Sequence, residues 1–363
     1  MVETAVIITE SGLVYVTDAM PGIYRKGRPG AFYYEDAQGK KIKNQAQLQR
    51  IHSLVLPPAW KSVWISIKAN GYLQATGFDV AGRKQYRYHS KWIKRRSAHK
   101  YYRLLDFGKA LPQARKRIKK DLQRRSLDEQ KVLAICVDLL QKTLLRVGAK
   151  DYLQKYGSIG LSTLKDKHVK IRGNSLNLSF IGKKGVPQQA SLTDQRLSRL
   201  VKKCRDIPGQ ELFQFYDGDG QRKSIDSGRI NAYIKEVTGN DFTAKDFRTW
   251  GGTLEALRQL AICQASPQVS SKSKIEVQVL DEVAKKLGNT RAVCKSAYVY
   301  PLLLEAYRDD ALDKWLKKVD TSASARDKTL AQNEQVLLSF LKWQARGKTL
   351  SSKRFHGVTV LPK

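Results

Sequence analysis

The sequence predicts an α+β protein, in which a small N-terminal antiparallel β-sheet domain precedes a larger, mainly α-helical catalytic domain with an inserted β-hairpin. Two observations support this prediction. Short β-rich runs, separated by glycine and proline, fill the first 90 residues. Long stretches with helical periodicity follow. A chain of 363 residues can form two domains with a core each, and we expect them over residues 1–90 and 91–363.

The N-terminal runs are short enough to be strands of a small sheet. Each has four or five residues of high strand propensity and is bounded by turn residues. One helical stretch, over residues 45–54, intervenes. The predicted strands cover residues 5–9, 13–17, 31–34 and 63–67.

Amphipathic helices dominate the second part of the chain. They are predicted over residues 193–203, 227–237, 244–264, 275–287, 290–300 and 329–343, with a basic tail after them. A hairpin interrupts the helical pattern, because residues 168–172 and 175–180 alternate around Gly173-Asn174 and a second turn follows at 182–185. A hairpin embedded among helices is often a functional insertion.

The charge balance indicates a polyanionic partner. Lys and Arg number 67 against 33 Asp and Glu, which gives a net charge of +34. Each neutralised phosphate releases condensed counterions, so this excess favours nucleic acid. A ribosomal or membrane-surface protein could share the balance. The hydrophobic fraction of 41% indicates that the chain as a whole folds and is not a disordered basic segment.

The most basic region lies where the two predicted domains meet. Residues 83–125 contain only two acids among many Lys and Arg, and tyrosines and a tryptophan are interleaved with them. Charged runs are often solvated helix faces, but aromatics beside cations suit contacts with phosphates and sugars. We therefore expect this region to join two lobes that close around a DNA duplex.

Several absences favour a cytoplasmic, nucleoid-associated protein. No apolar run approaches the roughly 20 residues of a membrane span, and the N-terminus lacks the basic start of a signal peptide. We expect no membrane partner. The four cysteines, Cys136, Cys204, Cys263 and Cys294, are widely spread and include no C-x-x-C pair. They are predicted to be buried thiols in a reducing compartment, with no zinc site.

A predicted helix carries the first candidate catalytic residue, Arg248. Thr243 and Asp246 approximate a capping box, and Phe242 and Phe247 could form the accompanying hydrophobic staple. Arg248 would then lie in the second turn of a well-anchored helix. The plainer alternative is an ordinary surface arginine.

Two glycines, Gly251 and Gly252, follow within the same helix. Each costs about 1 kcal/mol relative to alanine, so we expect another backbone or a ligand to approach closely there. Farther along, Gly288 occupies the usual C′ position of a helix, which leaves Asn289 in a connection and Tyr298 on the next helix. Taken alone, Tyr298 is more typical of a packed core. A phenol with a pKa of about 10 needs nearby cations to act as a nucleophile.

Six segments, in order, match the motifs of one protein family. They are QATGFD (74–79) with RKQYRY (83–88), LRVGAKDY (145–152), GLSTLKDKH (160–168), FIGK (180–183), KDFRTWG (245–251) and KSAY (295–298). On these segments the chain resembles the type IB DNA topoisomerases, in the small bacterial and poxvirus-like form. The resemblance spans nearly the whole chain and implies ATP-independent relaxation of supercoils of both signs.

The resemblance implies roles for the catalytic residues. Tyr298 matches the nucleophile, which forms a 3′-phosphotyrosyl link and releases a 5′-hydroxyl. Arg146 and Arg248 match the arginines that hold the scissile phosphate. Lys183, on the turn of the hairpin, matches the lysine that protonates the leaving oxygen. The adjacent Lys184 leaves an offset of one residue open.

Asn289 stands where poxviral and eukaryotic members have histidine. Its amide can donate a hydrogen bond to a non-bridging oxygen, but it supplies neither a proton nor a charge. A histidine-like acid role is therefore excluded. The resemblance also implies DNA contacts at Arg83, Gln85, Tyr86, Tyr88, Tyr152 and Lys245, each of which could instead be a simple surface residue.

Cofactors are not expected. Two guanidiniums can stabilise the charge of a pentacoordinate phosphorane in place of a metal ion. The chain contains no phosphate loop and no carboxylate metal cluster, so neither a nucleotide cofactor nor a metal is predicted. Double-stranded DNA is the expected partner, held by a monomer.

Two alternatives share part of this evidence. A tyrosine recombinase would use the same Arg, Lys, Arg and Tyr chemistry as a tetramer, but the β-rich N-terminal part argues against it. A non-enzymatic nucleic-acid-binding protein would explain the charge, and would bind DNA in a salt-sensitive manner without a covalent adduct.

Overall fold

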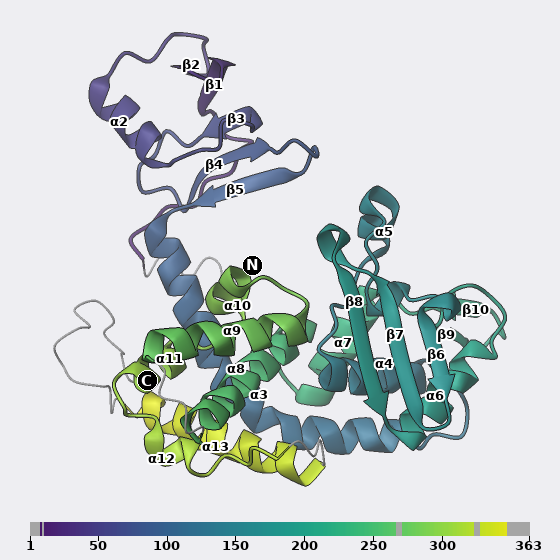
Figure 1. Cartoon of the computed structure of the whole chain (residues 1–363). Coiled ribbons are helices and arrows are strands. Elements are labelled where there is room, and N and C mark those ends of the chain that lie inside the picture. The colour runs from purple at the N-terminus through teal and green to yellow at the C-terminus, as the bar shows by residue number, and fades with distance from the viewer. Residues whose placement is uncertain (1–7, 9–10, 266–270, 323–326, 347–363) are drawn as a thin grey trace. The chain divides into compact units, whose positions relative to one another are not determined.

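The computed structural model describes residues 8, 11–265, 271–322 and 327–346, which are drawn as ribbon in Figure 1. The chain forms two compact units, Met1–Tyr102 and Arg103–Lys363. The division falls inside helix α3 (Ser90–Leu122), whereas the sequence places the domain boundary at the start of that helix. Within the described ranges, no helix has both the length and the apolar character needed to cross a membrane.

The first unit is built on a five-stranded antiparallel sheet of order β2-β1-β3-β4-β5. The strands are β1 (Ile23–Arg28), β2 (Ala31–Glu35), β3 (Lys61–Ile65), β4 (Leu73–Phe78) and β5 (Lys84–Tyr88). Helix α2 (Gln45–Ser53) packs on the sheet through Ile51, which shares a core with Ile23 and Ile65. This core covers one face of the sheet.

The predictions for this unit hold in part. The strands predicted at 31–34 and 63–67 and the helix at 45–54 are confirmed as β2, β3 and α2. The strand at 13–17 is wrong, because its backbone forms a single isolated bridge from Val14 to Gly71. Residues 5–7 and 9 of the first predicted strand, 5–9, lie outside the described residues. Strands β1, β4 and β5 are rich in polar residues and were not predicted.

Helix α8 lies at the centre of the second unit, and nearly all of its middle turns are buried. The helices of this unit are α3, α4 (Glu129–Thr143), α5 (Lys150–Tyr156), α6 (Gln195–Arg205), α7 (Ser227–Thr238), α8 (Ala244–Ala265), α9 (Lys272–Leu287), α10 (Arg291–Ala297), α11 (Pro301–Arg308), α12 (Asp313–Leu316) and α13 (Asp327–Ala345). The six predicted helices correspond to α6 to α10 and α13. Helices α4, α5, α11 and α12 were not predicted.

Helix α13 is tied to α8 by a buried carboxylate. Glu334 of α13 accepts a hydrogen bond from Nε1 of Trp250 on α8, at 2.9 Å. The same carboxylate receives both terminal nitrogens of Arg115 on α3, at 2.6 and 2.8 Å. Three helices far apart in the sequence therefore share one charged contact.

The predicted hairpin is confirmed and is part of a larger sheet. Strands β6 (Val169–Arg172), β7 (Ser175–Ile181) and β8 (Pro187–Thr193) run antiparallel side by side in Figure 1. Residue 193, predicted to begin a helix, is the last residue of β8. Helix α6 begins after Asp194, whose side chain accepts from the N–H of Leu197 at 2.8 Å. A separate small ladder pairs β9 (Gln214–Tyr216) with β10 (Arg222–Ser224).

The cysteines match their predicted environment with one exception. Cys136, Cys204 and Cys294 are buried free thiols. Cys263 is only partly buried, because it lies near the exposed C-terminal end of α8.

Candidate active site

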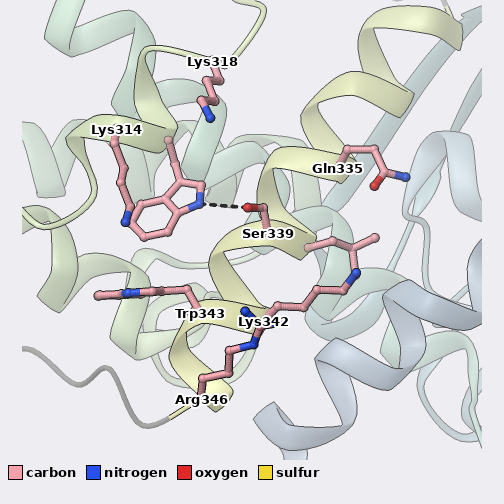
Figure 2. Close-up of a pocket in the computed structure, with 9 residues that line it drawn as sticks. Lys314, Lys318, Gln335, Ser339, Lys342, Trp343 and Arg346 are labelled. Carbon is pink, nitrogen blue, oxygen red and sulfur yellow. Dashed lines mark hydrogen bonds between the residues drawn. The ribbon is translucent and has the colours of Figure 1, made fainter.

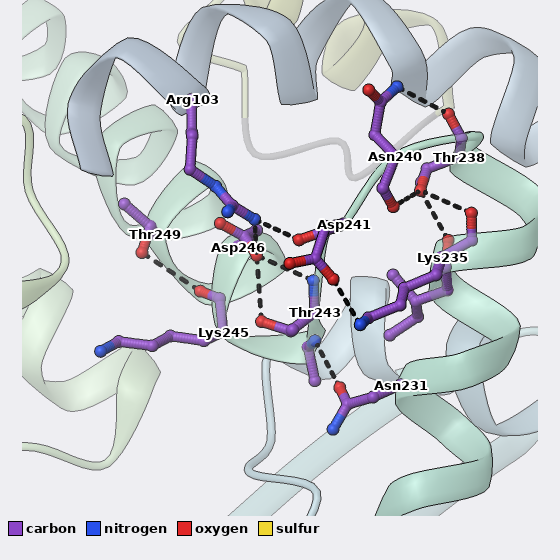
Figure 3. A network of polar contacts seen from close by, with 12 residues as sticks. Arg103, Asn231, Lys235, Thr238, Asn240, Asp241, Thr243, Lys245, Asp246 and Thr249 are labelled. Atoms are coloured by element: carbon purple, nitrogen blue, oxygen red, sulfur yellow. Dashed lines mark hydrogen bonds and ion pairs between the residues drawn. The ribbon is translucent and has the colours of Figure 1, made fainter. Parts of the chain in front are cut away.

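Helix α8, which carries Arg248, is anchored at its N-terminal end by the contacts shown in Figure 3. The carboxylate of Asp246 accepts hydrogen bonds from the backbone N–H and the hydroxyl of Thr243, at 2.8 and 3.0 Å. Arg103 lies 3.6 Å from the same carboxylate. The Asp246 half of the predicted capping box is therefore present, and it fixes the first turn of the helix.

The predicted hydrophobic staple takes a different form. Phe242 and Phe247 both pack edge-on against Phe107 of α3, with ring centroids 5.2 and 4.9 Å away. Phe107 is fully buried and also contacts Trp250. The start of α8 is therefore held by α3 as well as by its own cap.

The Arg248 guanidinium is buried in a fixed position. The residue is 3% exposed. Its Nη2 donates to the carbonyl of Leu287 at 3.0 Å, and its Nη1 donates to the carbonyl of Leu144. Leu144 ends α4 in the left-handed conformation, with φ of 55°. Nε of Arg248 is buried and has no hydrogen-bond partner among the described residues. Such orphaned buried donors are rare and concentrate at functional sites.

Tyr298 approaches α8 closely because Gly252 has no side chain. A Cβ at Gly252 would lie 2.9 Å from the carbonyl oxygen of Tyr298 and 3.2 Å from its Cβ. The next residue, Thr253, donates its hydroxyl to the Tyr298 carbonyl at 3.2 Å. At Gly251 a Cβ would lie 2.5 Å from the Leu144 side chain. The close approach predicted from the glycine pair is confirmed. Tyr298 itself is the C-cap residue of α10.

Arg146 lies in the connection between α4 and α5. Its carbonyl accepts from the N–H of Leu161 at 2.8 Å. Two glycines allow the backbones to cross at this point, since a Cβ at Gly148 would lie 2.8 Å from Cα of Gly160. Gly148 is also left-handed, with φ of 82°, a conformation that favours glycine. Arg146 therefore lies in an irregular segment whose backbone is held in place by this crossing.

Arg146 and Asn289 form the second half of the group. Nη2 of Arg146 donates to Oδ1 of Asn289, and Nη1 donates to the carbonyl of Gly288 at 3.3 Å. Gly288 is left-handed at the C′ position of α9, as predicted. Oδ1 of Asn289 accepts from Arg146, and the amide nitrogen of the same side chain is its hydrogen-bond donor. That Nδ2 is buried and lacks a partner among the described residues.

The cations around Tyr298 lower its pKa by more than burial raises it. Burial raises the pKa of the phenol, but the Arg248 guanidinium, 4.9 Å from the ring centroid and hydrogen-bonded to it, lowers that pKa. Arg146 and then Lys245 lower it further, so the net pKa lies below the ordinary value of 10. Burial in turn lowers the pKa of Arg248, an effect that Tyr298 opposes. The phenolate form is therefore easier to reach here than in a free tyrosine.

Lys183 lies apart from this group. It is exposed on the turn between β7 and β8, and its Nζ is 6.0 Å from the ring centroid of Tyr152 on α5. Tyr152 is 54% exposed. The turn is closed by a hydrogen bond from the N–H of Gly182 to the carbonyl of Val186, at 2.8 Å, and Lys184 within it is left-handed. Among the described residues, no hydrogen bond joins Lys183 to Arg146 or Arg248.

Four of the remaining predicted residues lie on or next to β5 in the first unit. Asp79, in the turn before this strand, accepts from Nε of Arg83 at 2.8 Å and from the amide of Gln85 at 2.9 Å. Tyr86 and Tyr88 stack with centroids 6.0 Å apart and an interplanar angle of 10°. Tyr86 is 49% exposed. One carboxylate thus orients two candidate contacts beside an aromatic pair in which Tyr86 is exposed and Tyr88 is partly buried.

Several supporting residues were not identified from the sequence. The carbonyls of Leu144 and Leu287 hold Arg248, Thr253 holds Tyr298, and Asp79 holds Arg83. Asp79 belongs to the QATGFD motif, which was a usable signal. Backbone carbonyls leave no trace in the side-chain pattern, so the first two could not have been found.

The arrangement can stabilise a phenolate and a developing oxyanion together. It combines two guanidiniums, an amide with a free donor and a phenol of lowered pKa. Guanidiniums bind the oxygens of phosphates in a planar, bidentate manner. A phosphate ester is therefore the substrate that the site fits best.

Comparison with known proteins supports the same conclusion for both units. The family described as "Eukaryotic DNA topoisomerase I, catalytic core" matches residues 89–327. The family described as "Bacterial DNA topoisomerase IB, N-terminal domain" matches residues 31–79.

Individual relatives agree with these matches. DNA topoisomerase 1B of Acanthamoeba polyphaga mimivirus is 31% identical over 298 residues, which cover 80% of this chain and 89% of the relative. DNA topoisomerase 1B of Vaccinia virus (strain Copenhagen) is 25% identical over 236 residues, 64% of this chain and 72% of the relative. DNA topoisomerase I of Monkeypox virus is 26% identical over the same length and coverage.

Proposed function

The chain belongs to the type IB DNA topoisomerases, in their bacterial and poxvirus-like small form, and relaxes supercoiled DNA; we propose that it does so through Tyr298. The phenolic oxygen of Tyr298 attacks a backbone phosphorus and expels the 5′ oxygen of the next nucleotide. The phenolic proton passes to solvent, and the DNA is held by a 3′-phosphotyrosyl link. After the free end rotates, the 5′-hydroxyl attacks the link and reseals the strand.

The observation that carries this proposal is the position of Tyr298 under Arg248. Its phenol lies 4.9 Å from that guanidinium and has a lowered pKa. We propose that Arg248 and Arg146 hold the non-bridging oxygens of the phosphate. The unpaired amide of Asn289 donates to one of them. Hydrogen-bond donors that are already oriented before the reaction need not reorganise as charge develops in the transition state.

The energy of the phosphodiester stays in the covalent link, so we propose that relaxation of positive and negative supercoils needs neither ATP nor a metal ion. The tyrosine recombinase alternative finds no support, because the N-terminal match is to a topoisomerase domain. A protein that only binds nucleic acid is excluded by the family.

The remaining assignments concern binding. We propose that Arg83, Gln85, Tyr86 and Tyr88 contact DNA from the first unit, and Tyr152 and Lys245 from the second. We also propose a monomer whose units close on one duplex, in the cytoplasm and associated with the nucleoid.

Trapping the covalent intermediate tests the proposed nucleophile. On a duplex whose cleaved fragment is too short to stay paired, the wild-type chain is expected to accumulate a protein–DNA adduct without ATP and in the presence of EDTA. Proteolysis and mass spectrometry should place the nucleotide on the peptide that contains Tyr298. An adduct on Tyr300 or on any other residue would contradict the assignment.

Lys183 is the proposed general acid, and we propose that the exposed turn that carries it closes on bound DNA. We expect Lys183→Ala to slow strand cleavage by about 10²- to 10⁴-fold, the usual contribution of a positioned proton donor. A substrate with a 5′-bridging sulfur, whose thiolate leaves without a proton, should restore the rate.

The matched control is Lys184→Ala, on the same turn and of the same charge. It should cleave both substrates at nearly the wild-type rate. If Lys184→Ala shows the defect and the sulfur rescue instead, the acid is Lys184 and the offset of one residue applies.

A further inference from the structure

A cavity of about 440 Å³ opens between α12 and α13 (Figure 2). Its walls are Lys314, Trp315, Lys318, Gln335, Leu338, Ser339, Lys342, Trp343 and Arg346. The α13 half of this wall lies beyond residue 327, where the match to the catalytic-core family ends. Cavities of roughly 300–1,000 Å³ typically hold a ligand larger than a single ion.

Four cations line the cavity, and no acid does. They are Lys314, Lys318, Lys342 and Arg346. Among the described residues, none of the four has a carboxylate partner within ion-pair distance. This differs from other lysines of the same unit, such as Lys286 and Lys295, whose Nζ atoms lie 2.5 and 2.8 Å from buried glutamates. Concentrated charge of one sign in a concave surface attracts counter-ions of the other sign.

Two indoles and a hydroxyl complete the wall. Nζ of Lys314 lies 4.1 Å from the ring centroid of Trp315 and 5.3 Å from that of Trp343, which holds the ammonium in place. Nε1 of Trp315 donates to Oγ of Ser339 at 3.3 Å. Because this oxygen accepts a hydrogen bond, its own proton is free to donate to an acceptor. The wall thus offers cations, a neutral donor and aromatic carbon together.

The cavity is a site separate from the catalytic group. None of the residues that line it belongs to the catalytic group. Glu334 marks where α13 contacts Trp250 of α8. Lys342 and Arg346 follow 8 and 12 residues later, which is about 12 and 18 Å farther along a helix with a rise of 1.5 Å per residue, so these two cations lie well beyond that contact.

We propose that this cavity is an accessory DNA site, which binds the sugar–phosphate backbone outside the segment that is cleaved. Phosphate oxygens would meet the ammonium and guanidinium groups, and a sugar or base would pack on the Trp343 ring. The chain's own residues 347–363 carry four cations and no acid, so their charge does not match the cavity. The proposal rests on the DNA substrate of the family and not on the roles given to Tyr298 and the arginines.

Two triple variants that remove the same number of positive charges, one in the cavity and one elsewhere, test the site. The variant Lys318→Gln/Lys342→Gln/Arg346→Gln removes three positive charges from the cavity. The control Lys202→Gln/Lys203→Gln/Arg199→Gln removes two lysines and one arginine from the exposed side of α6. Affinity is measured for each full-length chain against salt concentration, on a short duplex that spans one cleavage site and on linear DNA several times longer.

On long DNA, the slope of log affinity against log salt should fall by about 2.7 for the cavity variant, at 0.9 per phosphate contact. On the short duplex the cavity variant should keep the wild-type slope, and the control should keep it on both. Equal slopes for the two variants on long DNA overturn the proposal. Cleavage of the short duplex reports on whether the variant is folded, independently of the cavity.

Protection of wild-type lysines gives a second measurement that needs no variant. Long DNA should shield Lys318 and Lys342 from amine acylation, and a mononucleotide at the same phosphate concentration should not. Equal protection by the mononucleotide assigns the cavity to free nucleotides and overturns the DNA site. A lack of protection by either one overturns the site itself.

Discussion

Replacing Tyr298 with phenylalanine is expected to abolish plasmid relaxation while DNA binding stays nearly unchanged. The change removes one oxygen, the proposed attacking atom, and leaves the ring in place beside Gly252. Loss of a covalent nucleophile lowers a catalytic rate by on the order of 10⁵-fold or more. Relaxation of a supercoiled plasmid and binding to a short duplex measure the two properties.

Tyr300→Phe is the matched control. It removes the same atom from a tyrosine two residues away that is 9% exposed. We expect this variant to relax DNA at close to the wild-type rate. Relaxation by Tyr298→Phe at a normal rate would show that another residue attacks the phosphate.

Arg248→Gln is expected to produce the second-largest loss. A glutamine side chain can still donate a hydrogen bond, but the positive charge is gone. Removing one fixed donor to a developing oxyanion costs about 10²- to 10³-fold in rate, and Arg248 is also the largest of the influences that lower the pKa of Tyr298. Single-turnover cleavage measures the rate.

The pH dependence of this variant distinguishes a chemical role from a structural one. In the wild type the pKa of Tyr298 lies below its ordinary value, so the cleavage rate should rise with pH and level off below pH 10. In Arg248→Gln burial remains and the main opposing charge is lost, so the pKa rises and the rise in rate moves to higher pH.

Lys245→Gln is the comparison for that shift, since Lys245 lowers the same pKa least of the three cations. Its profile should move in the same direction by a smaller amount. If Arg248→Gln loses rate with no displacement of its profile, Arg248 acts without influencing the phenol. Thermal unfolding of both variants reports on the carbonyls of Leu144 and Leu287, which lose a donor in Arg248→Gln.

The sequence was sufficient for α2, for six helices of the second unit and for the hairpin, because their signals are local. Gly288 ends α9 in the left-handed conformation that only glycine adopts easily, and Asp246 caps α8. The glycine pair correctly indicated a close approach. Strand β5 was missed because three of its five residues are Lys, Gln or Arg, and β4 because Gln74, Thr76 and Gly77 interrupt its apolar residues.

The detailed geometry of the site could not be predicted for the same reason. Leu144 takes a left-handed conformation that leucine disfavours by about 1–2 kcal/mol, so no propensity points to it. Its carbonyl nevertheless binds Arg248, which is 104 residues away. The position of the Lys183 turn beside Tyr152 is also a tertiary property. Motif order predicted which side chains form the site, and packing determines how they are held.

Glu334 has a consequence for how the protein is made. Its carboxylate follows Trp250 by 84 residues and Arg115 by 219, so a ribosome finishes the catalytic helix long before it supplies that helix with its last buried partner. The three-helix contact among α3, α8 and α13 can therefore form only after residue 334 has been synthesised.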